Sequence, residues 1–281
     1  MRSTHAFVLC ALGAVLSVSV PVSSQIAQAP AVKRSAPQPA RLPDGKPNWT
    51  GFWDLPNGFL EAYRGPAGIS GPSRGGGEGR GAVNVPLAQR PTRVPEMKSP
   101  YKERYEALLK QAAAGTLPDP GALCLPQGMP GMMGAIYGME ILQTPKIIAI
   151  SSEFKAGTRR IWMDEKTHPA ADELEETFVG HSIGRWEGDV LVVDTVGIRA
   201  DVGLGGRPPL PHSSKMRIIE RFRQTAPGML VDEITFDDSE AYVASWTETR
   251  SYRYRADLKL QEFVCLENNR NVDERGVATF K

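Results

Sequence analysis

Two segments of this 281-residue chain place charged side chains on the apolar face of a predicted strand. From Met216 to Phe222, every second residue is apolar except Glu220, and the positions between them include two arginines. From Trp246 to Tyr254, the same alternation groups Glu248 and Arg250 with aromatic residues. Because a strand alternates its side chains between two faces, these charges are predicted to point inward. A buried charge costs several kcal/mol unless it is paired, so they indicate a structural ion pair or a ligand site.

The stretch from His181 to Val196 predicts a β-hairpin that also carries functional groups. Its strands are predicted at 181–187 and 190–196, because Gly188-Asp189 suits a tight turn and a β-branched apolar run follows. His181 and Arg185 are an even number of residues apart, so both fall on one face, which we predict to be interior. Convergence of these groups with Glu220, Glu248 and Arg250 would form a pocket for a small aromatic acid or phenol.

Three histidines, His168, His181 and His212, leave a metal site open as an alternative. Their long, irregular spacing differs from the i, i+4 pair of a helical zinc site. Loops at one end of the fold could still bring the three together; otherwise they are separate hydrogen-bonding side chains. We predict no metal and no cofactor.

Short segments of period-two alternation continue to the C-terminal region. Strands are predicted at 49–55, 139–143, 146–154, 158–164, 181–187, 190–196, 215–224, 229–236, 246–255 and 262–266. No long helix separates consecutive strands, which excludes a parallel sheet. We predict an all-β, mainly antiparallel fold, a closed or nearly closed lipocalin-like barrel of about ten strands, because closure removes exposed edges. A β-sandwich is the alternative.

One helix is predicted at 101–114, where it could cover one end of the barrel. Ser99 is the expected N-cap, Pro100 the first helical residue, and Gly115 the stop. The Gly-rich segment 71–81 lacks the context of a phosphate-binding loop and is predicted to be a flexible surface loop. Residues 46–281 are therefore predicted to form a single barrel domain.

The N-terminal segment is predicted to be a secretory signal peptide, residues 1–24, followed by a disordered linker over 25–45. Cleavage after Ser24 would remove Arg2 as its one charged residue, so the formal net charge falls from +1 to 0. Neutrality argues against nucleic acid or an acidic membrane as the partner. We predict an exported, periplasmic protein without a membrane anchor, and a homodimer is compatible with the sequence.

Two cysteines, Cys124 and Cys265, remain in the exported chain. In an oxidising compartment they are predicted to pair, and the bridge would contribute about 4 kcal/mol in the loop-entropy model. The alternative is two buried, inert thiols.

Several motifs carry a resemblance to a known family. They are GHSIGRWEGDVLVVDTVGI at 180–198, Pro211-His212-Ser213, IERFR at 219–223 and CLENN at 265–269. Together they resemble a large bacterial family of exported proteins, mostly of unknown function, over roughly 49–269. The resemblance implies a link to cofactor-free decarboxylases of lignin-derived phenylcoumaran dimers.

The implied reaction needs three kinds of protein group. A deprotonated phenol expels a benzylic ether oxygen to form a quinone methide, and loss of carbon dioxide or formaldehyde then leaves a stilbene. His181 is the predicted base, with Glu220 or Glu248 as the acid. The predicted substrate-binding residues are Arg185, Arg250, Trp246, Tyr252 and His212. The alternatives are a lipocalin-like carrier of an aromatic molecule and a metal-dependent hydrolase that uses the three histidines.

Overall fold

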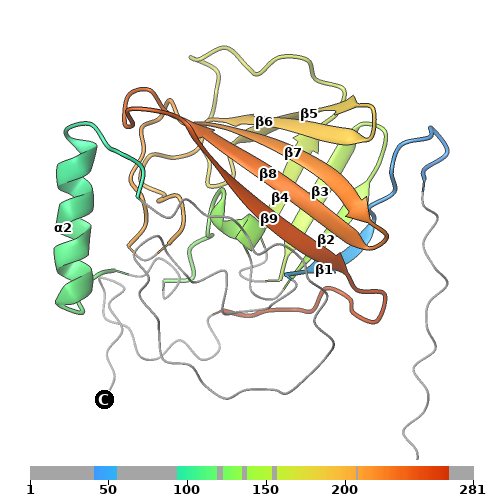
Figure 1. The fold of residues 1–281 in the computed structure, drawn as a ribbon, viewed down its shortest axis with the longest axis horizontal. Helices are drawn as coiled ribbons and strands as arrows, with labels where there is room; N and C mark the ends of the chain where they lie inside the picture. The colour runs from blue at the N-terminus through green and yellow to red at the C-terminus, as the bar shows by residue number, and fades with distance from the viewer. Residues whose placement is uncertain are drawn as a thin grey trace, which may run out of the picture. The chain divides into compact units, whose positions relative to one another are not determined.

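Nine strands form one closed barrel in the computed structural model, which describes residues 41–55, 94–118, 123–134, 138–153, 157–206 and 208–265 (Figure 1). Each strand pairs with its neighbour in sequence, and β9 closes the wall against β1. The strands are β1 (Gly51–Asp54), β2 (Met139–Gln143), β3 (Ile147–Ser152), β4 (Thr158–Trp162), β5 (His181–Glu187), β6 (Val190–Val196), β7 (Arg217–Ala226), β8 (Met229–Asp237) and β9 (Trp246–Tyr254). The predicted all-β barrel is confirmed, and the β-sandwich alternative is wrong.

The tenth predicted strand, at 262–266, does not form over its described residues, which end at 265. Strand β9 already pairs with β1, so the wall has no free edge at this point. The chain after Tyr254 instead runs to Cys265, which forms a disulfide with Cys124 at a Cα–Cα distance of 5.7 Å.

One strand pair departs from the antiparallel pattern. Strands β4 and β5 are parallel and share two register pairs, at Ile161 with Ser182 and Trp162 with Ile183. Parallel neighbours need a crossover, and residues 163–180 supply it without a helix. The barrel is therefore mainly antiparallel, as predicted, with one parallel pair.

The crossover covers part of the outer surface of the barrel. Thr177 forms a parallel bridge with Ile198, and the Leu174 side chain lies against Gly197. As a result β6 is buried on both faces: Val193 points inward, while Val192 and Asp194 lie on the outer face. This double burial explains why β6 is a continuous apolar run rather than an alternating one.

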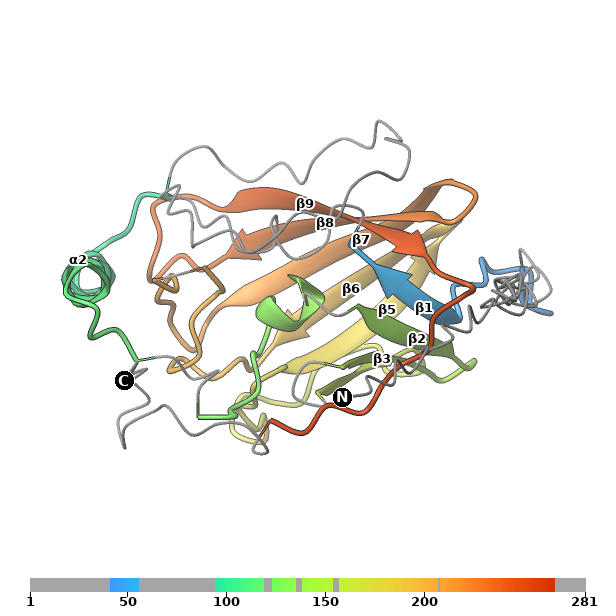
Figure 2. The same cartoon turned by 90° about the horizontal axis from the view of Figure 1, so that it is seen from below.

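The helix α2 (Tyr101–Ala113) packs beside one end of the barrel (Figures 1 and 2). Tyr101 and Tyr105 are its buried residues, and the Tyr101 hydroxyl lies 3.0 Å from the Glu240 carboxylate in the β8–β9 connection. Gly115 follows the helix with φ of +68°, as its predicted stop requires. The predicted Ser99 cap is wrong, because Pro100 occupies the N-cap position and no side chain caps the helix.

The predicted signal peptide, most of the predicted linker and the Gly-rich segment 71–81 lie outside the described residues. The end of the predicted linker is ordered, since Arg41 pairs with Asp189 at 2.7 Å and bridges Pro47. Among the described residues, no helix has the length and apolar character needed to cross a membrane.

Candidate functional site

A buried ion pair crosses the barrel interior. Glu220 is completely buried, as predicted, and pairs with Arg159 of β4, whose Nη1 donates to Glu220 Oε1 at 2.9 Å. Arg159 also donates to the Ser182 and Thr195 hydroxyls, at 3.0 and 2.8 Å. With its donors used in this way, the Arg159–Glu220 pair is a structural bridge rather than a ligand site.

Arg159 was not among the predicted interior residues, although the sequence contains a signal for it. Strand β4 carries two adjacent arginines, and only one of them can share a face with Ile161. Alternation assigns that face to Arg159, which lies two residues before the fully buried Ile161.

Glu248, Arg250 and Tyr252 also point inward, as predicted, but two of them hold a loop. Arg250 Nη1 donates to the Pro130 carbonyl at 2.6 Å, and Tyr252 Oη donates to the Met133 carbonyl at 2.7 Å. Both carbonyls belong to the segment around the 3-10 helix η1 (Gly131–Gly134), which is drawn in green within the barrel outline in Figure 2. Trp246 stacks on Phe236 with ring centroids 4.8 Å apart. These contacts give Arg250, Tyr252 and Trp246 packing roles.

Asp232 is a third acid that faces the interior, and it was not predicted from the sequence. It is completely buried, and neither carboxylate oxygen has a hydrogen-bond partner in the described part of the chain. Burial, reinforced by the charge of Glu220, raises the pKa of Asp232 well above its ordinary value. Its neighbours in register are Phe222 and Arg250.

His181 and Arg185 lie on the outer face of β5, so their predicted interior position is wrong. The interior face carries Ser182 and Gly184, which are buried, and Trp186, whose ring packs 5.1 Å from that of Trp49. The Arg185 side chain is 61% exposed and donates to Glu187 at 2.8 Å. Apolar residues occur on both faces of β5, so alternation alone did not determine which face is buried.

A pocket opens in the barrel wall where β4 and β5 separate. Pairing between them ends at Trp162 and Ile183, while the Met163 N–H still bonds the Lys146 carbonyl on the β3 side. The Met163 side chain lies over Gly184, where an added Cβ would be 2.6 Å from its sulfur. The pocket has a volume of about 400 Å³, within the usual range for small-molecule sites.

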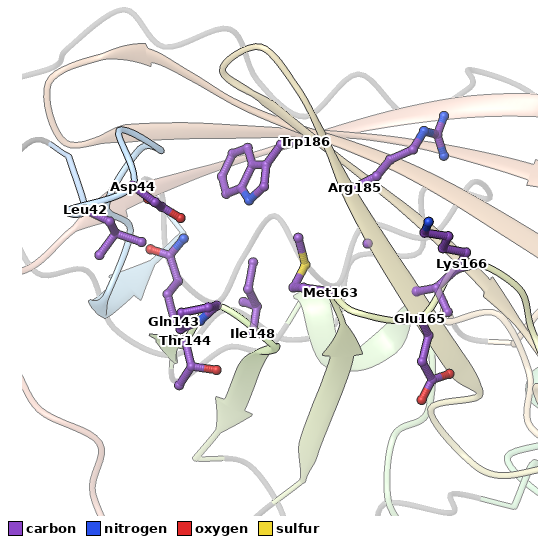
Figure 3. Close-up of a pocket in the computed structure, with 13 residues that line it drawn as sticks. Leu42, Asp44, Gln143, Thr144, Ile148, Met163, Glu165, Lys166, Arg185 and Trp186 are labelled. Atoms are coloured by element: carbon purple, nitrogen blue, oxygen red, sulfur yellow. The ribbon is translucent and has the colours of Figure 1, made fainter.

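The pocket has an apolar middle and two polar ends (Figure 3). Trp186, Met163 and Ile148 form the middle. At one end lie Lys166, Arg185 and Glu165, and at the other Asp44, Gln143 and Thr144. Arg185 and Trp186 project to opposite sides of β5, so the pocket wraps around the edge of this strand.

Next to the charged end, four titratable side chains form a chain of contacts. Glu165 Oε2 lies 3.2 Å from His181 Nε2, and His181 Nδ1 lies 2.9 Å from His168 Nδ1. His168 Nε2 in turn lies 3.6 Å from Asp194 Oδ1, which accepts a hydrogen bond of 2.9 Å from Arg217 Nε. Burial alone would raise the pKa of Asp194, but the hydrogen bonds and charge of Arg217, together with His168, outweigh burial, so this pKa lies below its ordinary value.

His212, the third histidine, does not join the other two. It is completely buried, with Nδ1 2.7 Å from the Ser213 carbonyl and Nε2 2.6 Å from the Val202 carbonyl. These contacts hold a loop and contradict its predicted role in substrate binding. Among the described residues, no three His, Cys, Asp or Glu side chains are grouped so that they could hold a metal ion, so the three-histidine site does not form.

No protein-family model matches the chain, and no curated protein matches it. Among solved structures, it is similar to a secretary abundant heat soluble (SAHS) protein from Ramazzottius varieornatus. The two share 12% sequence identity with a TM-score of 0.27, over 48% of this chain and 82% of that protein. A similarity this low carries no argument about function.

Proposed function

We propose that this protein binds a small aromatic molecule with an acidic group in the pocket between β4 and β5. The observation that carries the proposal is the pocket itself, in which an aromatic wall lies beside two cationic side chains. Trp186 presents a large, rigid surface for a flat ring, and Met163 can adapt its thioether to the opposite side. An aromatic ring would therefore occupy the apolar middle.

Charge supports an acidic group at one end of the ligand. Lys166 and Arg185 are both exposed at this end, and an arginine can bind a carboxylate through two parallel hydrogen bonds. Glu165 sits beside them and would accept a hydrogen bond from a phenol or carboxylic acid O–H. The opposite end, with Asp44 and Gln143, suits a second polar group on an elongated molecule.

Titration calorimetry with ferulate, a phenolic carboxylate, tests this proposal. Arg185→Gln should weaken binding about 10-fold or more, since it removes a charge-assisted bond of about 1.5–3 kcal/mol. Arg221→Gln is the matched control, because Arg221 binds the same Glu187 carboxylate at 3.0 Å but does not line the pocket. Equal affinities of the two variants would contradict the proposed carboxylate contact.

An exported, cofactor-independent carbon–carbon lyase is the second candidate function. The observation that favours it is the contact between His181 and Glu165, which puts an imidazole one residue away from the pocket lining. In this version His181 is the base for the substrate phenol, and Glu220 and Glu248 have no part because they face the interior. Stilbene release from a phenylcoumaran carboxylate by the purified protein separates this lyase from a carrier.

A further inference from the structure

The wall pocket borders the edge of β5 as well as its side chains. Four consecutive residues of this strand, 183–186, line the pocket. Neighbouring side chains of a strand point to opposite faces, as Arg185 and Trp186 do in Figure 3. A cavity that all four residues line must therefore include the strand edge between the two faces. The edge of a strand carries its backbone N–H and C=O groups, so these groups belong to the pocket.

The hydrogen bonds of β4 identify which backbone groups of β5 face this edge. The Met163 N–H donates to the Lys146 carbonyl on the β3 side at 2.8 Å, so the backbone groups of the preceding residue, Trp162, face β5. The parallel register of Trp162 with Ile183 then sets the Trp162 carbonyl opposite the Gly184 N–H. This is the last backbone pairing between the two strands, because their register ends here.

Beyond this point, three backbone groups on the β5 edge have no partner in the described part of the chain. They are the Gly184 carbonyl and the N–H and carbonyl of Trp186, since alternate residues of a strand direct their backbone groups to the same side. Arg185 lies between them and pairs with Val192 of β6 on the other side. Gly184 is buried, and buried backbone carbonyls are nearly always hydrogen-bonded. The edge therefore offers acceptors and a donor to a bound molecule.

The size of the pocket limits how much of a partner can pair with this edge. An unpaired strand edge is a general site for strand addition, in which a partner contributes main-chain N–H and C=O groups. The open edge covers only residues 184–186, and the volume of about 400 Å³ suits a small molecule. These dimensions favour one amide unit within a small ligand over a whole strand from another protein.

We propose that the ligand is an aromatic acid that contains a secondary amide, such as an N-acylated amino acid, and that β5 recognises this amide through its backbone. The amide N–H donates to the Gly184 carbonyl, and a carbonyl or carboxylate oxygen of the ligand accepts from the Trp186 N–H. The ring and carboxylate contacts rest on the proposed function, and the amide contact adds the group that joins them.

The position of Gly184 supports an amide between the ring and the carboxylate. Gly184 lies beneath the Met163 side chain, where an added Cβ would be 2.6 Å from the sulfur, and it directly precedes Arg185. Its carbonyl therefore lies between the apolar middle of the pocket and the cationic end. A linker from a ring in the middle to a carboxylate at Arg185 passes this carbonyl. An amide linker gives the carbonyl a donor, whereas an ester or hydrocarbon linker gives it none.

Calorimetry on the full chain with N-feruloylglycine and its ester counterpart, feruloylglycolate, tests the proposal. The two ligands share the ring, the carboxylate and the length of the linker, but only the amide has an N–H. The ester should bind about 10-fold or more weakly, because its linker oxygen faces the Gly184 carbonyl with no proton between them. Arg185→Gln should weaken both ligands by the same factor, since both keep the carboxylate.

Backbone amide signals in 1H–15N spectra locate the contact. The Trp186 amide signal should shift when N-feruloylglycine binds, because its N–H gains an acceptor. The Ser182 amide is the matched control: it lies on the same edge of β5 but already pairs with β4, so its signal should stay fixed.

Equal affinities of the amide and the ester would overturn the backbone contact, as would a Trp186 amide signal that stays fixed or a lack of binding by either compound. If ferulate still binds and Arg185→Gln weakens it, the proposed function stands and only the amide contact is lost. A 10-fold preference for the amide with a shifted Trp186 signal, but no effect of Arg185→Gln, supports the amide contact and contradicts the carboxylate contact.

Discussion

At the scale of single residues, Asp232 makes the free energy of unfolding depend on pH. Its raised pKa means that the folded state keeps a proton that the unfolded state loses above about pH 4. The contribution of Asp232 to stability is therefore greatest at low pH and falls as the pH rises toward its folded-state pKa, by up to about 1.4 kcal/mol per pH unit.

Asp232→Asn should stabilise the protein, and the gain should grow from pH 5 to pH 8. An amide removes the cost of keeping a carboxyl neutral while filling the same space. Urea unfolding at several pH values measures the difference. Asp238→Asn is the control, because Asp238 is equally buried but accepts hydrogen bonds from the Ser213 N–H and hydroxyl. It should lose stability, and a loss for Asp232→Asn at pH 8 would contradict the account.

The inward or outward direction of a charged side chain could be predicted only where apolar residues occupied one face of the strand and not the other. Glu220 lies between the fully buried Ile218 and Phe222, so its inward position follows from alternation. For His181 and Arg185 the same reasoning failed, because Trp186 on the other face proved to be the interior residue. The contact of His168 with His181 could not be predicted, since a crossover without regular structure makes it.

At the scale of elements, the pocket lies where it does because β4 and β5 pair over only two residues each and then separate. Gly184 has no Cβ, and this lets the Met163 side chain cover the strand at the open part of the wall. The strands 139–143, 181–187 and 190–196 have the bounds predicted from their alternation and turns. The parallel pair was not predictable, because its crossover has none of the periodicity that marks a helix.

Gly184→Ala should both destabilise the barrel and narrow the pocket. The new methyl group would lie 2.6 Å from the Met163 sulfur and 2.7 Å from Ile161 Cγ2, and overpacking of this kind costs about 1–3 kcal/mol. The Tm and the affinity for ferulate should both decrease. Gly157→Ala is the control, since nothing lies within 4 Å of its added Cβ. An unchanged Tm for Gly184→Ala would contradict this prediction, because it would show that Met163 and Ile161 can move aside for the methyl group without loss of stability.

At the scale of the whole molecule, two features hold the chain together. The barrel wall closes on itself between β9 and β1, and a disulfide links two distant segments of the chain. The barrel was predictable from the number of short strands and the shortness of most turns. The Cys124–Cys265 bridge spans 141 residues and therefore closes a loop that contains eight of the nine strands. Such a loop restricts the unfolded chain strongly.

Reduction of this disulfide should lower the free energy of unfolding by about 2–5 kcal/mol. For a domain of this size that corresponds to a decrease in Tm of roughly 5–15 °C. Calorimetric scans with and without reductant measure it, and a Cys124→Ser, Cys265→Ser double variant should match the reduced protein. An unchanged Tm after complete reduction would show that the bridge does not stabilise the fold.

The position of the bound ligand tests the central claim most directly. Indole N–H signals of the five tryptophans can be followed by NMR during a ferulate titration, with Trp186→Phe to assign the pocket signal. We expect the Trp186 signal to shift and the Trp246 signal to stay fixed, because Trp186 lines the wall pocket and Trp246 packs on Phe236 in the core. A shift of Trp246 with Trp186 unchanged would place the ligand inside the barrel and contradict the account.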